Sequence, residues 1–224
     1  MCFSATASFV SGTVLGAVGI ASLAKANEPK KKLFAAIPLM FSIQQLVEGF
    51  VWLYLSKGEP SSVLEPFVFT FLLFALILWP VWIGASVILF EEDKTRKIVQ
   101  MLFLGGGLVF SFFSAYYMMN YPVSAKIDHY HILYVVDFPN KDNPLTAILY
   151  FGATVGPLLA SSVKKVPVLG VLIFISYVIT KFIYDDYVIS VWCFFAAVVS
   201  GVIYLMVTDR IKSFNKASTE VHVG

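Results

Sequence analysis

Charged residues are scarce in this chain of 224 residues. Asp, Glu, Lys and Arg make up 13% of it, which is about half of their usual share in a soluble domain. Hydrophobic residues make up 58%, and the mean hydropathy is +0.81. A soluble domain of this size has too little interior to bury so much apolar surface, and disordered chains have the opposite composition. The composition therefore indicates a polytopic membrane protein that contacts the lipid bilayer.

Cysteine is also scarce, and neither positive nor negative charge is in large excess. The chain has two cysteines, Cys2 and Cys193, which are too few for a disulfide framework. The formal net charge is +2, so the chain lacks the strongly basic surface that nucleic acids bind. We therefore expect neither a disulfide-stabilised scaffold nor a nucleic-acid partner.

Long stretches with few or no charges divide the sequence into seven apolar segments. A helix needs about 20 apolar residues to cross about 30 Å of hydrocarbon, and a charge at the bilayer centre costs several kcal/mol. The segments do not alternate as β-barrel strands do. We predict an all-α bundle in one domain, residues 1–210, followed by a mobile cytoplasmic tail, residues 211–224. The predicted transmembrane helices are 4–25, 33–55, 63–90, 98–120, 144–163, 166–185 and 187–209.

The basic residues predict the orientation of this bundle. With seven spans, 12 of the 16 Lys and Arg residues fall on one side. Basic loops stay in the cytoplasm, so we expect the N-terminus outside, the C-terminus in the cytoplasm and a multi-pass protein of the cell membrane. The sequence leaves a homo-oligomer open.

The longest outer loop, residues 121–143, contains residues that favour β-structure. The run from Ala125 to Ile132 alternates roughly between polar and apolar residues, and residues 133–136 are rich in strand formers. We predict a short extended segment or a hairpin that lies over the outer face of the bundle. Asn143 is expected to cap the helix that Pro144 begins.

Two charges lie well inside predicted spans. Glu48 shares a helix face with Gln44 four residues earlier, and Gln45 lies beside them. An ionisable group at this depth is typical of a functional site, so these three residues are predicted to bind a cation, a proton or a polar solute. Lys181 pairs with Asp185 at i+4, extends toward the interface, or forms a salt bridge with Glu48 across the bundle.

Candidate metal ligands and a nucleophile lie near the outer face. In an extended segment, His129 and His131 point to the same side, so they could bind a divalent metal ion, with an oxygen ligand from Glu48, Asp128 or Asp137. Two solvent-exposed histidines are the alternative. Cys2, if exposed by removal of Met1, could act as a ligand or nucleophile, or it is a small buried residue.

Two stretches resemble a known protein family. The opening residues Met1-Cys2-Phe3-Ser4-Ala5-Thr6-Ala7-Ser8-Phe9 and the stretch Ile43-Gln44-Gln45-Leu46-Val47-Glu48-Gly49 are similar to motifs of a family of bacterial multi-pass membrane proteins of unknown function. The resemblance implies a bacterial inner-membrane protein and no particular activity. The seven-span topology is also similar to that of SWEET-type sugar transporters, as an analogy of topology alone.

These features support three hypotheses of function. The first is a transporter or binding protein for a small polar solute or ion, with a pocket that opens outward and is lined by Gln44, Gln45, Glu48 and Lys181. The second is a membrane-embedded, metal-dependent enzyme of a hydrolase type with its site at the outer face. The third is a sensor or receptor. The sequence does not choose between a transporter, an enzyme and a sensor.

Overall fold

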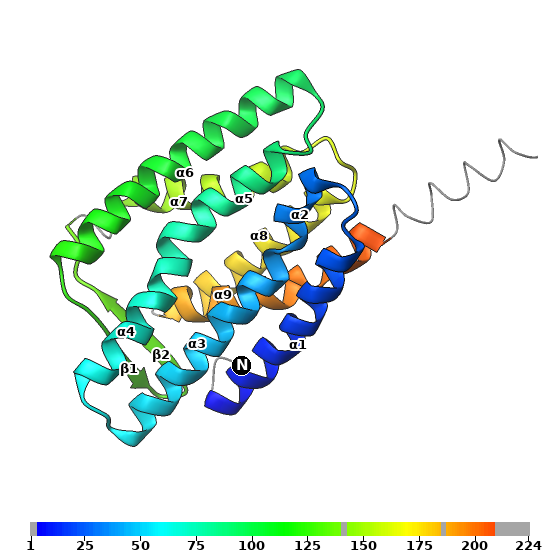
Figure 1. The fold of residues 1–224 in the computed structure, drawn as a ribbon. Helices are drawn as coiled ribbons and strands as arrows, with labels where there is room; N and C mark the ends of the chain where they lie inside the picture. Colours follow the sequence, from blue (N-terminus) through cyan, green and yellow to red (C-terminus); the bar gives the residue numbers. More distant parts are fainter. Residues whose placement is uncertain (1–3, 140–142, 185–186, 209–224) are drawn as a thin grey trace, which may run out of the picture.

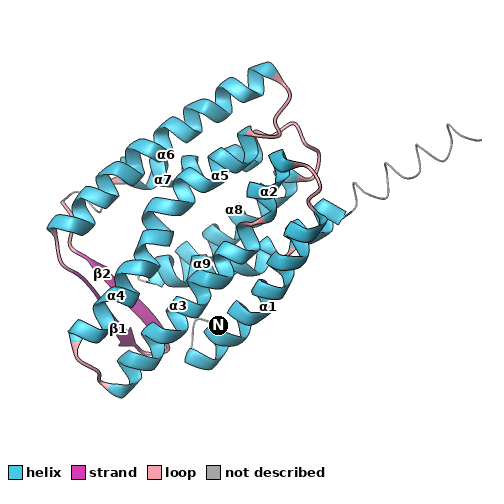
Figure 2. Ribbon diagram, viewed as in Figure 1, coloured by secondary structure: helices cyan, strands magenta, loops and turns pink. Residues whose placement is uncertain are grey.

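The computed structural model describes residues 4–139, 143–184 and 187–208, which form a bundle of apolar helices with one β-hairpin at its end (Figures 1 and 2). The predicted all-α bundle is confirmed, and so is a hairpin within residues 121–143. The elements are α1 (Ala5–Lys25), α2 (Pro29–Ala35), α3 (Ile37–Lys57), α4 (Ser61–Leu72), the π-helix η1 (Leu73–Leu78), α5 (Trp79–Ile88), α6 (Lys94–Asn120), β1 (Val123–Asp128), β2 (His131–Val136), α7 (Pro144–Leu159), α8 (Val166–Ile183) and α9 (Val188–Ser200).

Six helical segments are long and apolar enough to cross a membrane. Each falls on a predicted span, and two of them combine shorter elements: α2 with α3, and α4 with η1 and α5. The six segments are Ala5–Lys25, Pro29–Lys57, Ser61–Ile88, Lys94–Asn120, Val166–Ile183 and Val188–Thr208. The chain therefore has the helices of a multi-pass membrane protein.

The predicted span 144–163 forms a shorter apolar helix than expected. Helix α7 has 16 residues, so it is about 24 Å long at 1.5 Å per residue, against about 30 Å of hydrocarbon. It begins where the sequence predicts, because the Asn143 side chain accepts a hydrogen bond from the Leu145 N–H at 2.9 Å. It ends at Leu159, and the residues that follow turn toward the start of α6, where Arg96 donates a hydrogen bond to the carbonyl of Ser161 at 2.9 Å.

Helices α1 and α3 lie against each other along much of their length, and small residues allow this approach. A Cβ atom on Gly19 would lie 2.5 Å from the backbone nitrogen of Leu39, too close for any side chain. The Ser42 hydroxyl donates a hydrogen bond to the carbonyl of Gly12 at 2.6 Å. Such contacts are how helices associate in lipid, where apolar side chains gain little from burial against each other. They fix the position of α3, which carries Gln44, Gln45 and Glu48.

A π-helical turn interrupts the helix formed by α4 and α5. Pro80 has no N–H to donate to the preceding turn, and the carbonyl of Ala75, five residues earlier, accepts a hydrogen bond from the Tyr150 hydroxyl at 2.8 Å. The carbonyl of Ile77 accepts one from the Ser111 hydroxyl, also at 2.8 Å. Side chains of α6 and α7 therefore satisfy backbone groups of η1, as is required inside a membrane.

The hairpin lies at one end of the bundle and packs on it. Strands β1 and β2 are antiparallel, and Asp128 opposes His131. Ile132 has no exposed surface, and the ring of Tyr134 stacks on that of Phe71 with centroids 4.4 Å apart. The apolar side of β2 therefore covers the end of the bundle, as the sequence predicts for this segment.

Basic residues concentrate at the end opposite the hairpin. The loops that join α1 to α2, α5 to α6 and α7 to α8 all lie there (Figure 1). Of the twelve described Lys and Arg residues, nine belong to this end, namely Lys25, Lys30, Lys31, Lys32, Lys94, Arg96, Lys97, Lys164 and Lys165. The two ends of the bundle thus differ in charge in the way the sequence predicts for the two sides of a membrane protein.

Candidate functional site: a buried polar network beside a cavity

The polar residues of α3 are completely buried. Gln44, Gln45 and Glu48 each have an exposed fraction of 0%. The Glu48 carboxylate accepts a hydrogen bond from the Ser190 hydroxyl of α9 at 2.6 Å and another from the Gln45 amide at 3.3 Å. Gln45 accepts a hydrogen bond from the Ser11 hydroxyl of α1 at 3.3 Å. This branch of the network joins α1, α3 and α9.

A second branch starts at Gln44. Its carbonyl oxygen accepts a hydrogen bond from the Trp79 indole of α5 at 2.7 Å. Its amide nitrogen donates one to the sulfur of Cys193 in α9 at 3.4 Å. The ring of Phe41 stacks on the Trp79 indole, with centroids 3.9 Å apart. The second branch therefore joins α3, α5 and α9.

A cavity of about 520 Å³ lies at the hairpin end of the bundle, within the range of small-molecule sites. It is open on one side, and it is lined by η1, the C-terminal part of α6, the N-terminal part of α7, the end of α8, the start of α9 and the chain after β2. Its walls are mainly aromatic and aliphatic, and the lining residues that carry polar groups are Ser114, Tyr117, Asn143, Thr146, Tyr150, Tyr177, Lys181, Trp192 and Cys193.

Lys181 is the one charged side chain among the described residues that line this cavity. It lies near the end of α8, and its side chain is exposed. Glu48, Gln44 and Gln45 are not among the lining residues. Cys193 belongs to both features, since it lines the cavity and accepts the hydrogen bond from Gln44.

This arrangement differs from the single polar pocket that the sequence predicts. The structure brings Glu48 together with Gln44 and Gln45, and it places Lys181 in a neighbouring cavity that is more apolar than expected. Sequence reasoning missed the roles of Ser11, Trp79, Ser190 and Cys193. A signal was present in α9, where Ser190 and Cys193 are three residues apart and therefore share a helix face.

The two candidate metal-binding histidines lie in different surroundings. His129 is the first residue of the two-residue turn between β1 and β2, with a φ of 53°, and its side chain is 80% exposed. His131 begins β2 and is buried against the rings of Tyr184 and Tyr187, with centroids 5.1 and 4.6 Å away. The turn removes the extended geometry that the sequence argument assumes.

No group of three His, Cys, Asp or Glu side chains that could hold a metal ion occurs in residues 4–139, 143–184 and 187–208. Glu48 lies in the buried network described above, whereas His129 is exposed at the hairpin tip. The metal site formed by His129, His131 and Glu48 stays a prediction. Cys2, Asp185 and the tail 211–224 lie outside the described residues.

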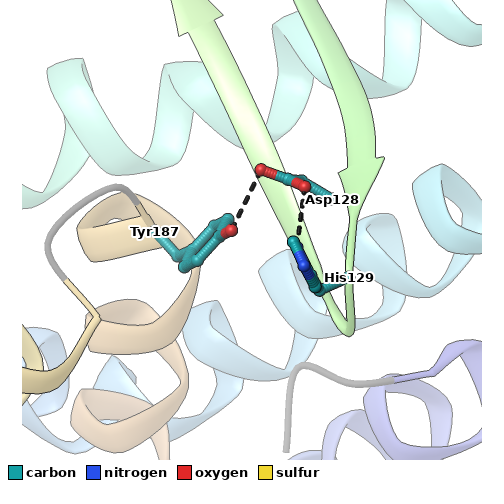
Figure 3. A network of polar contacts seen from close by, with 3 residues as sticks. All are labelled: Asp128, His129 and Tyr187. Atoms are coloured by element: carbon teal, nitrogen blue, oxygen red, sulfur yellow. Dashed lines mark hydrogen bonds and ion pairs between the residues drawn. The ribbon is translucent and has the colours of Figure 1, made fainter.

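The hairpin tip is held by a polar contact to the start of α9. The Asp128 carboxylate accepts hydrogen bonds from the Tyr187 hydroxyl and from the His129 ring nitrogen, both at 3.0 Å (Figure 3). The hydrogen bond from Tyr187, with that from His129, lowers the pKa of Asp128 below its ordinary value. Burial, together with the nearby His129, lowers the pKa of His131, so the neutral imidazole is favoured in the folded protein.

A second polar cluster lies at the opposite, basic end. Glu91, in the loop after α5, is buried and accepts hydrogen bonds from the Ser162 N–H at 2.8 Å, the Ser161 hydroxyl at 3.3 Å and the Ser162 hydroxyl. Burial opposes ionisation here, but these hydrogen bonds and one from the backbone N–H of Asp93 lower the pKa of Glu91 overall. The cluster connects the α5–α6 loop to the α7–α8 loop.

A comparison with protein families identifies the group to which the chain belongs. The model of a family of unknown function (DUF6629) matches residues 1–218. The chain belongs to this family. The resemblance of the opening residues and of residues 43–49 to a family of unknown function is thereby confirmed. No curated protein and no solved structure matches the chain.

Proposed function

We propose that this protein is a seven-span membrane protein that binds a small solute in the cavity at its hairpin end. The cavity itself carries this proposal: about 520 Å³ is enough for a small molecule, and a mainly apolar wall with a few polar groups is typical of such sites. The described lining residues belong to the hairpin ends of their helices. The cavity is therefore reached from the hairpin end of the bundle rather than from the basic end.

The same proposal places the hairpin end outside the cell membrane. The support is the concentration of basic residues at the opposite end, since basic loops stay in the cytoplasm. In this orientation α7 is the fifth span, and its short length is compensated by local thinning of the bilayer or by protein packed at its ends. The solute then enters from the outer side.

Transport is the second candidate, and the π-helix η1 favours it. Ala75 and Leu76 of η1 line the cavity, and π-helical turns occur frequently at functional sites. The carbonyls of Ala75 and Ile77 bond to side chains of other helices, so this turn can change its partners when a solute binds. Uptake of solute into proteoliposomes would separate transport from binding.

Cysteine labelling in intact cells tests the proposed site and orientation. Ala147 lines the cavity and is exposed, so we expect Ala147→Cys, in a chain with Cys2→Ser and Cys193→Ser, to react with a membrane-impermeant maleimide added outside. Leu102→Cys is the matched control, because Leu102 is 72% exposed on the face of α6 that would contact lipid. Reaction of Ala147→Cys only after the cells are permeabilised would refute the orientation.

A further inference from the structure

We propose that the solute is an amphipathic anion, a single apolar chain that ends in a carboxylate. This inference rests on the proposed function and adds the chemical class of the ligand. Two properties of the cavity carry it: the ammonium of Lys181, which is the one charged side chain among the described lining residues, and the apolar character of most of the remaining wall.

The charged side chain among the described residues that line the cavity is a lysine, Lys181. An ammonium in a partly desolvated cavity attracts an anion more strongly than it does in water. Asn143 and Thr146, at the N-terminus of α7, also line the cavity. The N-terminal end of a helix carries a partial positive charge, so α7 adds to the field of Lys181. A cationic solute would be disfavoured by both.

The remaining wall is suited to an alkyl chain. Aromatic rings from four helices contribute to it, namely Phe110, Phe113, Phe151, Tyr177 and Trp192. Burial of apolar surface against such rings stabilises a complex in proportion to the area removed from water. A small polar solute such as a sugar would leave most of this apolar wall without a partner. The preferred ligand therefore has one charged end and an apolar body.

The position of the cavity fits entry of such a ligand from the outer membrane–water boundary. Lys181 lies in the last turn of α8, at the hairpin end, where a lysine ammonium can stay near water while its stem contacts apolar groups. The carboxylate would remain beside Lys181, and the chain would extend among the aromatic side chains of α6, α7 and α9. Cys193 marks the inner limit of the cavity, where the network of Gln44 begins.

Binding of three probes with one chain length tests the inference. Dodecanoate, dodecanol and dodecyltrimethylammonium differ in the charge of the head group, and binding is measured by native mass spectrometry of the protein in lipid nanodiscs, with empty nanodiscs as the blank. We expect dodecanoate to bind at least about tenfold more tightly than the other two, a difference that corresponds to one favourable charge contact. Lys181→Gln should remove this preference, and Lys181→Arg should retain it.

Matched variants separate failure of this inference from failure of the proposed function. Lys57→Gln removes an exposed lysine at the same end, outside the cavity, and should leave the preference unchanged. Ala147→Trp fills the cavity and should weaken all three probes, with Leu102→Trp as its control. Equal binding of dodecanoate and dodecanol that is lost in Ala147→Trp would overturn the carboxylate inference and retain the cavity. Binding that is unaffected by Ala147→Trp, in a variant whose thermal unfolding matches wild type, would overturn both.

Discussion

Ser190 donates a hydrogen bond of 2.6 Å to the carboxylate of Glu48 across the interface between α9 and α3. Both residues are completely buried, so the contact joins helices that are 142 residues apart in the sequence in the interior of the bundle. A buried carboxylate is tolerated in such an interior only where donors satisfy it. Ser190 and Gln45 are these donors. The network around Glu48 therefore helps to fix how α3 and α9 pack against each other.

Replacing Glu48 with Leu should lower the free energy of unfolding by about 2–4 kcal/mol, because Ser190 and Gln45 would both lose a buried acceptor. Glu48→Gln should cost less, since its amide oxygen can still accept the hydrogen bond from Ser190. The measurement is SDS-induced unfolding in mixed micelles, with Glu59→Leu, an exposed residue beyond α3, as the control. A cost for Glu48→Leu no larger than that for Glu59→Leu would contradict the role of this network.

Replacing Tyr150 with Phe should lower the free energy of unfolding by about 0.5–1.5 kcal/mol, the usual net value of one hydrogen bond. The lost hydroxyl donates to the Ala75 carbonyl at 2.8 Å, and that carbonyl belongs to the π-helix. Tyr116→Phe is the control, because the Tyr116 side chain is 54% exposed on α6. If both variants unfold alike, the π-helical turn does not depend on Tyr150.

Replacing Glu91 with Gln should destabilise the protein at neutral pH by about 1–3 kcal/mol, because a buried acceptor of several hydrogen bonds loses its charge. The folded protein holds the pKa of Glu91 below its ordinary value of 4.5. The stability that comes from its ionised form is therefore complete above pH 4.5 and is lost as the pH falls through the lower, folded pKa. Unfolding curves of wild type and Glu91→Gln should converge in acid, whereas the exposed neighbour Glu92→Gln should match wild type throughout.

Mild acid should loosen the hairpin through His131. Its pKa in the folded protein lies below the ordinary value of 6.5 because of burial, so protonation is easier once the hairpin detaches. The docked hairpin therefore loses stability as the pH falls below 6.5, while Asp128, with its lowered pKa, stays ionised. Hydrogen exchange of residues 123–136 at pH 7.5 and 5.5 should show this loosening.

Two hairpin variants assign this pH dependence to one histidine. His131→Phe keeps a ring against Tyr184 and Tyr187 and removes the titrating group, so its hydrogen exchange should respond little to pH between 7.5 and 5.5. His129→Asn is the control, because Asn tolerates the positive φ of this turn position and His131 remains. A hairpin that loosens equally in His131→Phe would assign the effect to another group.

The helices were predictable from the sequence because a helix that crosses a bilayer needs about 20 mainly apolar residues. Long apolar segments with few or no charges locate six helices, and the caps and prolines locate their ends, as Asn143 does for α7. The shorter extent of α7 was not predictable from apolar length. It depends on the contacts of Ser161 and Ser162 with Glu91 and Arg96, which join loops about 70 residues apart in the chain.

The candidate site was only partly predictable, for a reason of geometry. A lone charge inside an apolar span is visible in the sequence, and this is how Glu48 and Lys181 stand out. Whether two such charges share a cavity depends on which helix lies between them, and the position of α9 places Cys193 there. The cavity itself is formed by side chains from η1 to α9 that carry no distinctive motif.

The central claim is that the cavity binds an anionic solute from the hairpin side. The most direct test compares the rates at which a membrane-impermeant maleimide modifies Ala147→Cys with and without dodecanoate. The variant also carries Cys2→Ser and Cys193→Ser, and the protein is held in nanodiscs. We expect saturating dodecanoate to slow the modification by about tenfold or more, as occupancy of a site with Kd well below the ligand concentration requires, and dodecanol at the same concentration to have little effect. A modification rate that dodecanoate leaves unchanged would contradict the account.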